Sequence, residues 1–230
     1  MHYAFELGDR PSLPIAGSSQ RFPIRRIYCV GRNYADHAKE MGGNPEREPP
    51  FFFDKPPDAV IENGVPVPYP PRTANLHHEI ELVVAIGREG ANIPLEDANA
   101  YIFGYAVGND LTRRDLQFAA RDKGRPWDTA KGFDHSAPIT QIHRIDDVGL
   151  IEKGEIWLSV NDTVKQRGDI ADMIWSVPEI IVELSQLYRL MPGDLIFTGT
   201  PAGVGPLVPG DEVQGGIELL GTLSFRIAAA

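Results

Sequence analysis

The sequence predicts a β-rich protein of mixed α/β class, in which many short strands accompany a few short helices. Glycine (23 residues) and proline (20 residues) are plentiful in the chain of 230 and are spread along it. Frequent turn formers of this kind favour short strands and turns over a helical bundle. Apolar runs of strand length recur between them, and the clearest helical pattern is confined to residues 174–188.

The overall composition fits one well-cored domain. From the length and the 42% hydrophobic content, we expect residues 1–22 to form an N-terminal arm or edge hairpin and residues 23–230 the main domain. The net charge of −10 argues against general binding to nucleic acid or to an anionic membrane. No apolar stretch approaches the ~20 residues of a membrane span. No signal-peptide pattern is present either, so we expect a cytoplasmic protein.

The single cysteine, Cys29, rules out an intrachain disulfide and argues against a thiolate zinc cluster. It lies in a short apolar run, which predicts a buried and unreactive thiol.

In the first half of the chain, apolar runs predict strands and Gly- or Pro-rich segments predict turns. A short helix is expected over residues 33–41, with Asn33 as its N-cap and Gly42-Gly43 at its end. Residues 44–50 are charged and proline-rich, which predicts a loop, whereas Phe51–Phe53 predict a short buried strand. Further strands are expected at residues 26–30, 59–61, 65–69, 82–86 and 105–109.

The second half continues with helices and strands of similar length. In the helix predicted over residues 174–188, Pro178 suits the first turn. The apolar face of this helix is expected to comprise Ile181, Leu184, Leu187 and Tyr188. Other helices are expected at residues 94–101 and 111–123, and strands at 156–161, 194–199 and, two or three of them, within 211–227.

Two glutamates mark a candidate metal site. Glu79 and Glu81 lie two residues apart where the chain enters the apolar strand, so their side chains should share one face. Two carboxylates on one buried face repel each other and lose hydration, which a bound cation or protonation of one carboxyl relieves. His77 and His78 flank the pair, and we expect them to support the site or the fold without binding the metal.

Asp110 is a third acidic candidate, because it ends the apolar strand predicted over residues 105–109. Carboxylates at strand ends are well placed to face a cleft. Three carboxylates suit Mg²⁺, Mn²⁺ or Ca²⁺ better than zinc or copper. The alternative is that Asp110 only caps the helix that follows it.

The helix predicted after Asp110 carries an arginine and an amide on the same face. Arg114 and Gln117 lie at i+4 and i+7 from Asp110 and are suited to bind a carboxylate or an oxyanion. The alternative is a solvated helix face with an Asp110–Arg114 pair. We expect Arg121, farther along the helix, to be a surface charge.

Two further segments are candidates for the lining of a cleft. Lys131 lies among small residues ahead of Gly132-Phe133 and either projects into a cleft or is a surface charge. Residues 198–205 are glycine-rich but lack the features of a phosphate loop or a dinucleotide fingerprint. Their backbone N–H groups and the Thr200 hydroxyl could hold a substrate carboxylate, and a purely structural turn is the alternative.

His37 and Glu40 are spaced i, i+3 on the first predicted helix and should share a face. A carboxylate beside an imidazole raises its basicity, so the pair could take a proton from water as a general base. A surface His–Glu pair is the alternative.

In their order along the chain, these motifs resemble those of the fumarylacetoacetate hydrolase superfamily, in particular its short bacterial members. The resemblance runs from about residue 22 to the end. It is carried by residues 31–40, 78–82, 109–110, Arg114, Gln117, 131–134 and 198–205. Residues 48–53, 124–127 and 171–179 make the chain most similar to the fumarylpyruvate hydrolases of that superfamily, although Asp54 stands where many relatives have cysteine or methionine.

The resemblance implies a rolled mixed β-sheet with short helices, forming a catalytic domain over residues 23–230 that assembles as a homodimer. It implies Mg²⁺ or Mn²⁺, or Ca²⁺ in some members, bound by Glu79, Glu81 and Asp110. The implied substrate is an acylpyruvate, a 2,4-dioxo acid. Fumarylpyruvate would be cleaved to fumarate and pyruvate in gentisate-type degradation of aromatic compounds.

The resemblance also implies roles for the other candidates. His37, oriented by Glu40, would deprotonate a water that attacks the 4-carbonyl carbon. The oxyanion would be stabilised by Lys131, Arg114 and Gln117, and the substrate would be bound by Arg32, Gly199 and Thr200. The loop around residues 42–50 would close over the substrate.

Two alternatives to hydrolysis stay open. One is oxaloacetate decarboxylation, or isomerase or hydratase chemistry on a 2-oxo acid, on the same scaffold. The other is a non-catalytic metal-dependent binding protein.

Overall fold

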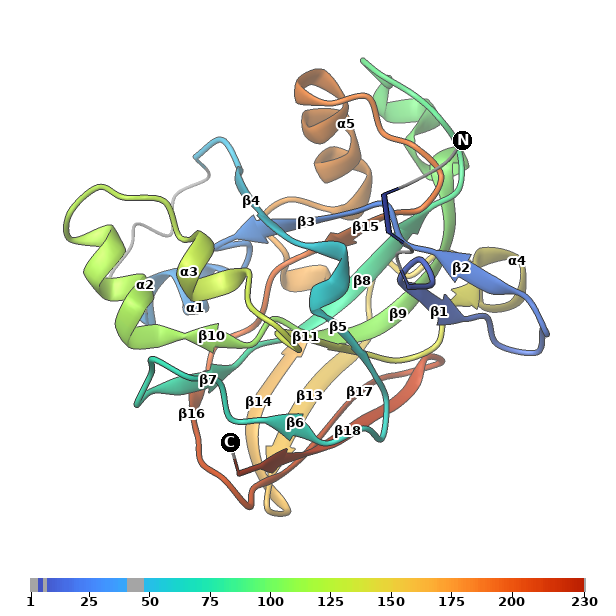
Figure 1. Ribbon diagram of the computed structural model, residues 1–230. Helices are drawn as coiled ribbons and strands as arrows, with labels where there is room; N and C mark the ends of the chain where they lie inside the picture. Colours follow the sequence, from blue (N-terminus) through green and yellow to red (C-terminus); the bar gives the residue numbers. More distant parts are fainter. Residues whose placement is uncertain (1–3, 6–7, 41–47, 230) are drawn as a thin grey trace.

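A mixed β-sheet of eight strands forms the centre of the fold (Figure 1). The computed structural model describes residues 4–5, 8–40 and 48–229. Within these residues, the strand order is β4 (Phe51–Lys55), β3 (Arg26–Gly31), β15 (Asp194–Phe197), β8 (Ile80–Ile86), β9 (Ile102–Asn109), β11 (Ala137–Ile139) and β5 (Val60–Glu62). The eighth strand, β12 (His143–Arg144), pairs with β9. The pairs β3–β15 and β5–β11 are parallel, and the other pairs of this sheet are antiparallel.

Strand β8 is buried on both faces, as its continuous apolar sequence predicts. Ile80, Leu82 and Val84 point into the larger of two hydrophobic clusters. Val83 and Ala85 point into the smaller one on the opposite face. Glu81 alternates with the first set, so it belongs to the face that carries Val83 and Ala85.

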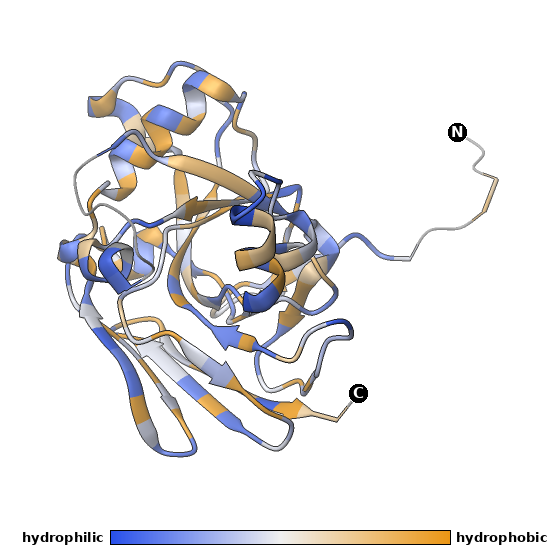
Figure 2. Ribbon diagram, turned by 90° about the vertical axis from the view of Figure 1, so that its left-hand side faces the viewer, coloured by the Kyte–Doolittle hydropathy of each residue, from blue (hydrophilic) through white to orange (hydrophobic). Residues whose placement is uncertain are grey.

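A second sheet of five strands packs against β8 and β9 and closes the larger cluster. Its order is β14 (Thr163–Asp169), β13 (Glu155–Val160), β17 (Glu212–Ile217), β18 (Gly221–Ala228) and β6 (Val67–Pro68). Apolar and polar residues alternate along several of its strands (Figure 2). Asn161 and Asp162 connect β13 to β14 with φ of 49° and 59°, as a tight hairpin turn requires.

The N-terminal residues form a hairpin of β1 (Ser12–Pro14) and β2 (Arg21–Pro23). Leu13 and Phe22 are buried in the smaller hydrophobic cluster, beside Cys29 of β3. This hairpin therefore covers the second face of β8. Burial raises the pKa of the Cys29 thiol well above its usual range, in agreement with the unreactive thiol predicted for it.

A small sheet and three short helices gather on one side of the main sheet (Figure 1). The sheet has the order β10 (Thr112–Arg113), β7 (Leu76–His78) and β16 (Gly205–Leu207). The helices are α1 (Ala35–Glu40), α2 (Arg114–Arg121) and α3 (Asp128–Lys131). The remaining elements are α4 (Ile145–Val148), α5 (Val177–Leu187) and the 3₁₀ turns η1 (Pro57–Ala59), η2 (Leu95–Tyr101) and η3 (Ile170–Asp172).

Helix α5 begins three residues later than predicted, and its buried face matches the predicted one only in part. Ser176 and Glu179 form a capping box, which fixes the start at Val177. The buried residues include Val177, Ile180, Ile181 and Leu184. The prediction was wrong for Leu187 and Tyr188, which are 64% and 38% exposed, because the apolar stripe ends where the helix passes the edge of the core.

Two other predictions need correction. The helix predicted over residues 111–123 begins only at Arg114, because Thr112 and Arg113 pair with β7 as strand β10. The strand at Phe51–Phe53 exists but is not buried: Phe51 is 38% exposed and its two neighbours are half-buried. The Gly42-Gly43 helix end and the first part of the loop predicted over residues 44–50 lie outside the described residues.

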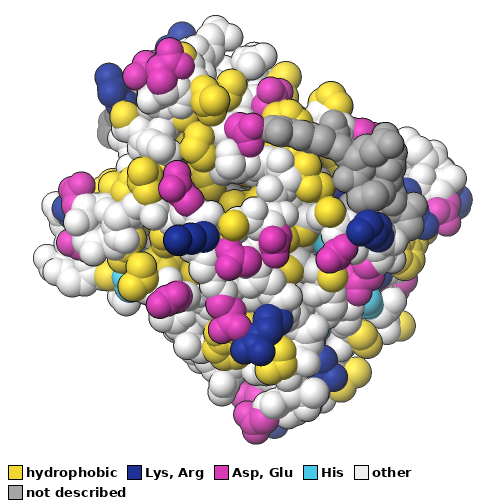
Figure 3. Space-filling view, turned by 180° about the vertical axis from the view of Figure 1, so that it is seen from behind, with side chains coloured by type: hydrophobic (Ala, Val, Ile, Leu, Met, Phe, Trp, Pro, Cys, Tyr) yellow, Lys and Arg dark blue, Asp and Glu magenta, His cyan; other side chains and the backbone are white. Residues whose placement is uncertain are grey.

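On the face seen from behind, acidic and basic side chains are interspersed (Figure 3). Among the described residues, no helix has both the length and the apolar character needed to cross a membrane.

Candidate active site

A pocket lies where α1, α2, α3 and the ends of β8, β9 and β15 meet. About 470 Å³ within it, counted out to its opening, is free of protein atoms. Polar side chains line it from several separate segments, together with a smaller number of apolar ones. Its polar and glycine residues are Gly31, Arg32, His37, Glu79, Glu81, Asp110, Arg114, Gln117, Arg121, Lys131, Gly199 and Thr200.

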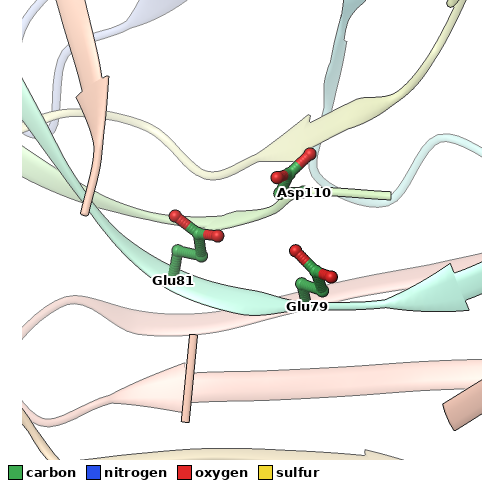
Figure 4. Close-up of side chains that lie close together, drawn as sticks. All are labelled: Glu79, Glu81 and Asp110. Atoms are coloured by element: carbon green, nitrogen blue, oxygen red, sulfur yellow. The ribbon is translucent and has the colours of Figure 1, made fainter. Parts of the chain in front are cut away.

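Three buried carboxylates lie at the bottom of this pocket. Glu79, Glu81 and Asp110 each offer one oxygen, and these oxygens all lie within 4.8 Å of one another. Figure 4 shows the three side chains converging, with the two glutamates rising from neighbouring positions and Asp110 facing them. The backbone supports this arrangement, because the N–H of Asp110 donates to the carbonyl of Glu79 over 2.8 Å.

Glu79 is compensated by two cations of the chain itself. Arg114 donates to its Oε1, and Lys131 Nζ donates to its Oε2 over 2.7 Å. Burial opposes ionisation of Glu79, but the charges of Lys131 and Arg114 outweigh it and hold its pKa below the usual range. Lys131 also donates to Asp110 over 2.6 Å and to Thr112 Oγ1 over 2.7 Å. Burial lowers the pKa of Lys131, but the charges of Asp110 and Glu79 outweigh it and raise that pKa.

Glu81 differs from its two partners. None of the ion pairs found among the described residues involves it, and its Oε2 accepts a hydrogen bond from the Gly199 N–H over 2.7 Å. Burial, followed by the charges of Asp110 and Glu79, raises the pKa of Glu81 well above its ordinary 4.5. The uncompensated negative charge expected for the pair of glutamates therefore lies on Glu81, while Glu79 is paired with cations.

The donor set fits a hard divalent cation. Three carboxylates at this spacing supply only oxygen ligands, which Mg²⁺ and Mn²⁺ prefer. A divalent ion would provide the positive charge that Glu81 lacks. Ligation of Glu79 or Asp110 would compete with the Lys131 ammonium, which lies between them.

Lys55 forms a second ion pair with Asp110. Its Nζ lies 2.8 Å from Asp110 Oδ1 and donates to the carbonyls of Leu111 and Lys131. Asp110 is therefore held by one lysine on each side, and the alternative that it caps a helix is wrong, since α2 begins four residues later.

Helix α2 presents one face to the pocket. Arg114 and Gln117 are 1% and 5% exposed, and the Arg114 Nη1 donates to Gln117 Oε1 over 2.5 Å. Arg114 Nε also donates to His77 Nδ1 over 3.4 Å. Burial, followed by the charge of Arg114, lowers the pKa of His77 to about 4, so this imidazole is neutral near neutral pH.

His37 and Glu40 form the pair expected on helix α1. Nδ1 of His37 lies 3.2 Å from Glu40 Oε2, and His37 lines the pocket that holds the carboxylates. Because a carboxylate only accepts hydrogen bonds, Nδ1 carries the proton and Nε2 is left as the basic nitrogen. The hydrogen bond with His37, aided by the N–H of Gly203, lowers the pKa of Glu40.

Backbone N–H groups of the glycine-rich segment donate hydrogen bonds to two carboxylates of the protein itself. Gly203 holds Glu40 and Gly199 holds Glu81, both through backbone N–H groups. Gly199 has φ of +99°, and a Cβ there would lie 2.7 Å from the Cβ of Asn33. A side chain is therefore excluded at Gly199 by both conformation and space.

Thr200 is fixed by a buried amide that sequence reasoning did not find. Gln166 Nε2 donates to Thr200 Oγ1 over 2.7 Å and to the carbonyl of Pro201 over 2.8 Å. Its Oε1 accepts from the N–H of Ile80 and lies 2.8 Å from His78 Nδ1. Gln166 thereby joins β14 to β8 and to the glycine-rich segment, and His78 contributes to the support of the fold.

Asn33 does not cap α1. Its Nδ2 donates to the carbonyls of Trp175 and Thr198, and its Oδ1 accepts from the N–H of Trp175. The prediction was wrong because this amide cross-links segments more than 140 residues away. The neighbouring Arg32, which lines the pocket, has a left-handed φ of 59°, and its guanidinium lies 5.8 Å from the Phe51 ring centre.

The family model for the fumarylacetoacetate (FAA) hydrolase C-terminal domain matches residues 26–228. The chain belongs to this family. The rolled mixed sheet with short helices that the resemblance implies is confirmed, since solved members share the fold over the whole chain.

Relatives within the family carry different activities in their names. The fumarylpyruvate hydrolase of a Ralstonia species is 47% identical over 183 residues, which cover 80% of this chain and 95% of the relative. The crystal structure of fumarylpyruvate hydrolase from Pseudomonas aeruginosa, in complex with Mn²⁺ and pyruvate, has a TM-score of 0.98 and 51% identity, with full coverage of both chains. The mitochondrial oxaloacetate tautomerase of Mus musculus is 42% identical over 203 residues, or 88% of this chain and 91% of the relative.

Every residue assigned to the site from the sequence, except Glu40, lines the pocket, and Glu40 contacts the pocket residue His37. Sequence reasoning missed Lys55 and Gln166. Arg121, expected as a surface charge, has a side chain that is 40% exposed and that also lines the pocket. The position of Lys55 at the end of a predicted strand, directly before Pro56-Pro57, was a usable signal. Gln166 stands between Lys165 and Arg167, so it gave no such signal.

Proposed function

We propose that this protein is a divalent-metal-dependent acylpyruvate hydrolase that cleaves fumarylpyruvate to fumarate and pyruvate. The observation that carries the proposal is that a His–Glu pair and a triad of oxygen ligands line the same pocket. Two fumarylpyruvate hydrolases at 47% and 51% identity support the choice of substrate.

The carboxylate triad is proposed to hold the metal. When bound by Glu79, Glu81 and Asp110, Mg²⁺ or Mn²⁺ would act as a Lewis acid on the carboxylate and 2-oxo group of the substrate. The complex of the Pseudomonas aeruginosa enzyme with Mn²⁺ and pyruvate supports this assignment.

His37 is proposed to act as the general base. Its Nε2 takes a proton from water, whose oxygen adds to the 4-carbonyl carbon, while Glu40 holds the proton on Nδ1 and stabilises the imidazolium. The bond between C3 and C4 then breaks, and its electron pair stays on C3. Protonation of C3 gives pyruvate, and the acyl carbon leaves as fumarate.

The basic side chains on α2 and α3 are proposed to stabilise the oxyanion at C4. Lys131 and Arg114 reach the pocket through their contacts with Glu79, and Gln117 is oriented by Arg114. Preorganised donors of this kind are commonly worth about 3 kcal/mol each. Thr200 and Arg32 are proposed to bind the substrate carboxylate, while Gly199 fixes Glu81 beside them.

Chemistry on oxaloacetate is the second candidate. It is favoured by relatives such as the mitochondrial oxaloacetate decarboxylase of Dictyostelium discoideum, which is 42% identical over 199 residues. Decarboxylation needs no attacking water, so the water-activating arrangement of His37 and Glu40 favours hydrolysis.

The test is to supply the Mg²⁺- or Mn²⁺-loaded protein with fumarylpyruvate, acetylpyruvate or oxaloacetate. We expect fumarylpyruvate to give fumarate and pyruvate in equal amounts, measured by loss of the dioxo-acid absorbance and by product chromatography. Turnover of oxaloacetate with no formation of fumarate from fumarylpyruvate would support the second candidate instead. Binding of pyruvate without turnover of any of these acids would support a non-catalytic binding protein.

We further propose that the protein acts in the cytoplasm as a homodimer on small molecules, with residues 23–230 as its catalytic domain. The net charge of −10 supports small-molecule partners over nucleic acid or an anionic membrane. Light scattering coupled to gel filtration tests the dimer.

A further inference from the structure

One face of helix α2 lines the pocket along the whole length of the helix. Arg114, Gln117, Phe118 and Arg121 have the spacing i, i+3, i+4 and i+7, which places them on one side of a helix. All four line the pocket that holds the carboxylate triad. Arg114 and Arg121 therefore mark two ends of the pocket wall, separated by about 10 Å along the helix axis.

The two arginines have different partners. Arg114 is buried and donates to Glu79, one of the proposed metal ligands. Arg121 has a side chain that is 40% exposed, and its guanidinium lies 4.7 Å from the centre of the Phe118 ring. The Phe118 ring supports the guanidinium at the pocket wall, two turns away from the carboxylates.

The ion pair that Arg121 makes with its neighbour is of a kind that exchanges easily. Arg121 Nη2 lies 3.2 Å from Asp122 Oδ1, and the Asp122 side chain is 64% exposed. Pairs between exposed side chains contribute little to stability. The contact with Asp122 therefore does not fix the Arg121 guanidinium strongly.

Apolar side chains complete the wall of the same pocket. Val30, Phe53 and Trp127 line it, and the rings of Phe53 and Trp127 lie 5.9 Å apart. The pocket thus has the three carboxylates at one end, apolar side chains along its wall, and Arg121 two helical turns away at the other end. A substrate that matches this sequence of surfaces has a chelating head, an apolar middle and an anionic tail.

We propose that Arg121 is a substrate-binding residue that recognises a carboxylate at the far end of the acyl chain. The inference rests on the proposed function, because the head of the substrate must be held at the triad. A seven-carbon dioxo diacid spans about 7 Å between its terminal carbons, which the reach of the two arginine side chains into the pocket accommodates. Arg121 then selects acyl groups that end in an anion over neutral ones.

The test compares one anionic and one neutral acyl group in the metal-loaded full chain. In Arg121→Gln we expect kcat/KM for fumarylpyruvate to fall by about 10- to 100-fold, the value of a hydrogen bond to a charged group, mainly through KM. For acetylpyruvate, which ends in a methyl group, kcat/KM should stay within about twofold of the wild type. Arg121→Lys keeps the charge and should recover part of the loss.

Lys123→Gln is the matched control, because it removes an exposed positive charge two residues away that does not line the pocket. It should leave the ratio of the two kcat/KM values unchanged. Equal losses on both substrates in Arg121→Gln, no loss on either, or the same change of ratio in Lys123→Gln would overturn the inference and leave the proposed function intact. Cleavage of neither substrate by the wild type would instead overturn the proposed function, and this inference with it.

Discussion

The ammonium nitrogen of Lys55 lies 2.8 Å from Oδ1 of Asp110, and these side chains are 0% and 1% exposed. The same ammonium donates to the carbonyls of Leu111 and Lys131. Lys55 therefore ties strand β4 to the end of β9 and to α3. It compensates one charge of a proposed metal ligand and orders two backbone segments that border the pocket.

Replacing Lys55 with methionine should destabilise the protein by about 3–5 kcal/mol, because it leaves Asp110 as a buried charge with one cation fewer. Urea unfolding followed by circular dichroism measures the change. Lys39→Met is the matched control, since Lys39 pairs with Asp36 at the surface, and it should change stability by no more than about 0.5 kcal/mol. Equal stability of Lys55→Met and wild type would contradict the structural role.

Glu81→Gln should abolish the response to metal without unfolding the protein. The change removes the one triad carboxylate that lacks a cation among the described ion pairs and keeps an acceptor for the Gly199 N–H. We expect the metal-free variant to be at least as stable as the wild type. It should show no rise in Tm with millimolar Mn²⁺ and no hydrolysis.

Differential scanning fluorimetry with and without Mn²⁺ measures both quantities, with the exposed Glu96→Gln as control. Full activity of EDTA-stripped wild type, or an unchanged Mn²⁺ shift in Glu81→Gln, would contradict the metal assignment.

His37→Ala should lower kcat by about 10²- to 10⁴-fold, the range expected for loss of a general base. The triad is untouched, so the Mn²⁺-dependent rise in Tm should match that of the wild type. Stopped-flow or steady-state absorbance assays measure the rate. A variant that hydrolyses fumarylpyruvate at the normal rate would show that His37 is not the base.

Glu40→Gln should lose stability in a pH-dependent way. The hydrogen bond with His37 lowers the pKa of Glu40 in the folded state below its ordinary value of 4.5. The ionised group therefore stabilises the fold above pH 4.5, and this contribution disappears as the pH falls through the lower folded pKa. Urea midpoints should differ between variant and wild type at pH 7 and converge as the pH falls from 4.5 through the lowered folded pKa of Glu40.

Asp36→Asn removes an exposed carboxylate from the same helix and serves as the control. A difference between Glu40→Gln and wild type that stays constant across this pH range would contradict the assignment.

The sequence indicated the site through local patterns and missed what depends on distant contacts. The spacing of Glu79 and Glu81 and the strand-end position of Asp110 made the three carboxylates candidates, and the family resemblance assigned them to one site. The reason given was only partly correct, because Lys131 and Arg114 already compensate Glu79 and leave the unmet charge on Glu81. Spacing along one strand carries no information about cations from other elements.

The same limit explains the errors in the fold. Asn33 has the residue type of an N-cap, but its amide joins segments that meet only in the folded sheet. Gln166 lies between two charged residues in β14, yet its side chain is buried and donates to Thr200 and to the carbonyl of Pro201. Leu187 and Tyr188 continue the helical period of α5 beyond the edge of the core. In each case the side chain's environment is set by residues that are distant in the sequence.

Strand β15 has a consequence for the order of events on the ribosome. It lies between β3 and β8, parallel to one and antiparallel to the other, so a nascent chain that has not yet reached Asp194–Phe197 carries both neighbours with open edges. Open strand edges invite pairing with other chains. Gly199, whose N–H donates to Glu81, lies two residues after this strand. Closure of the sheet and the hydrogen bond that positions Glu81 thus both depend on this late segment, and chains that stop before it should be inactive and prone to aggregate.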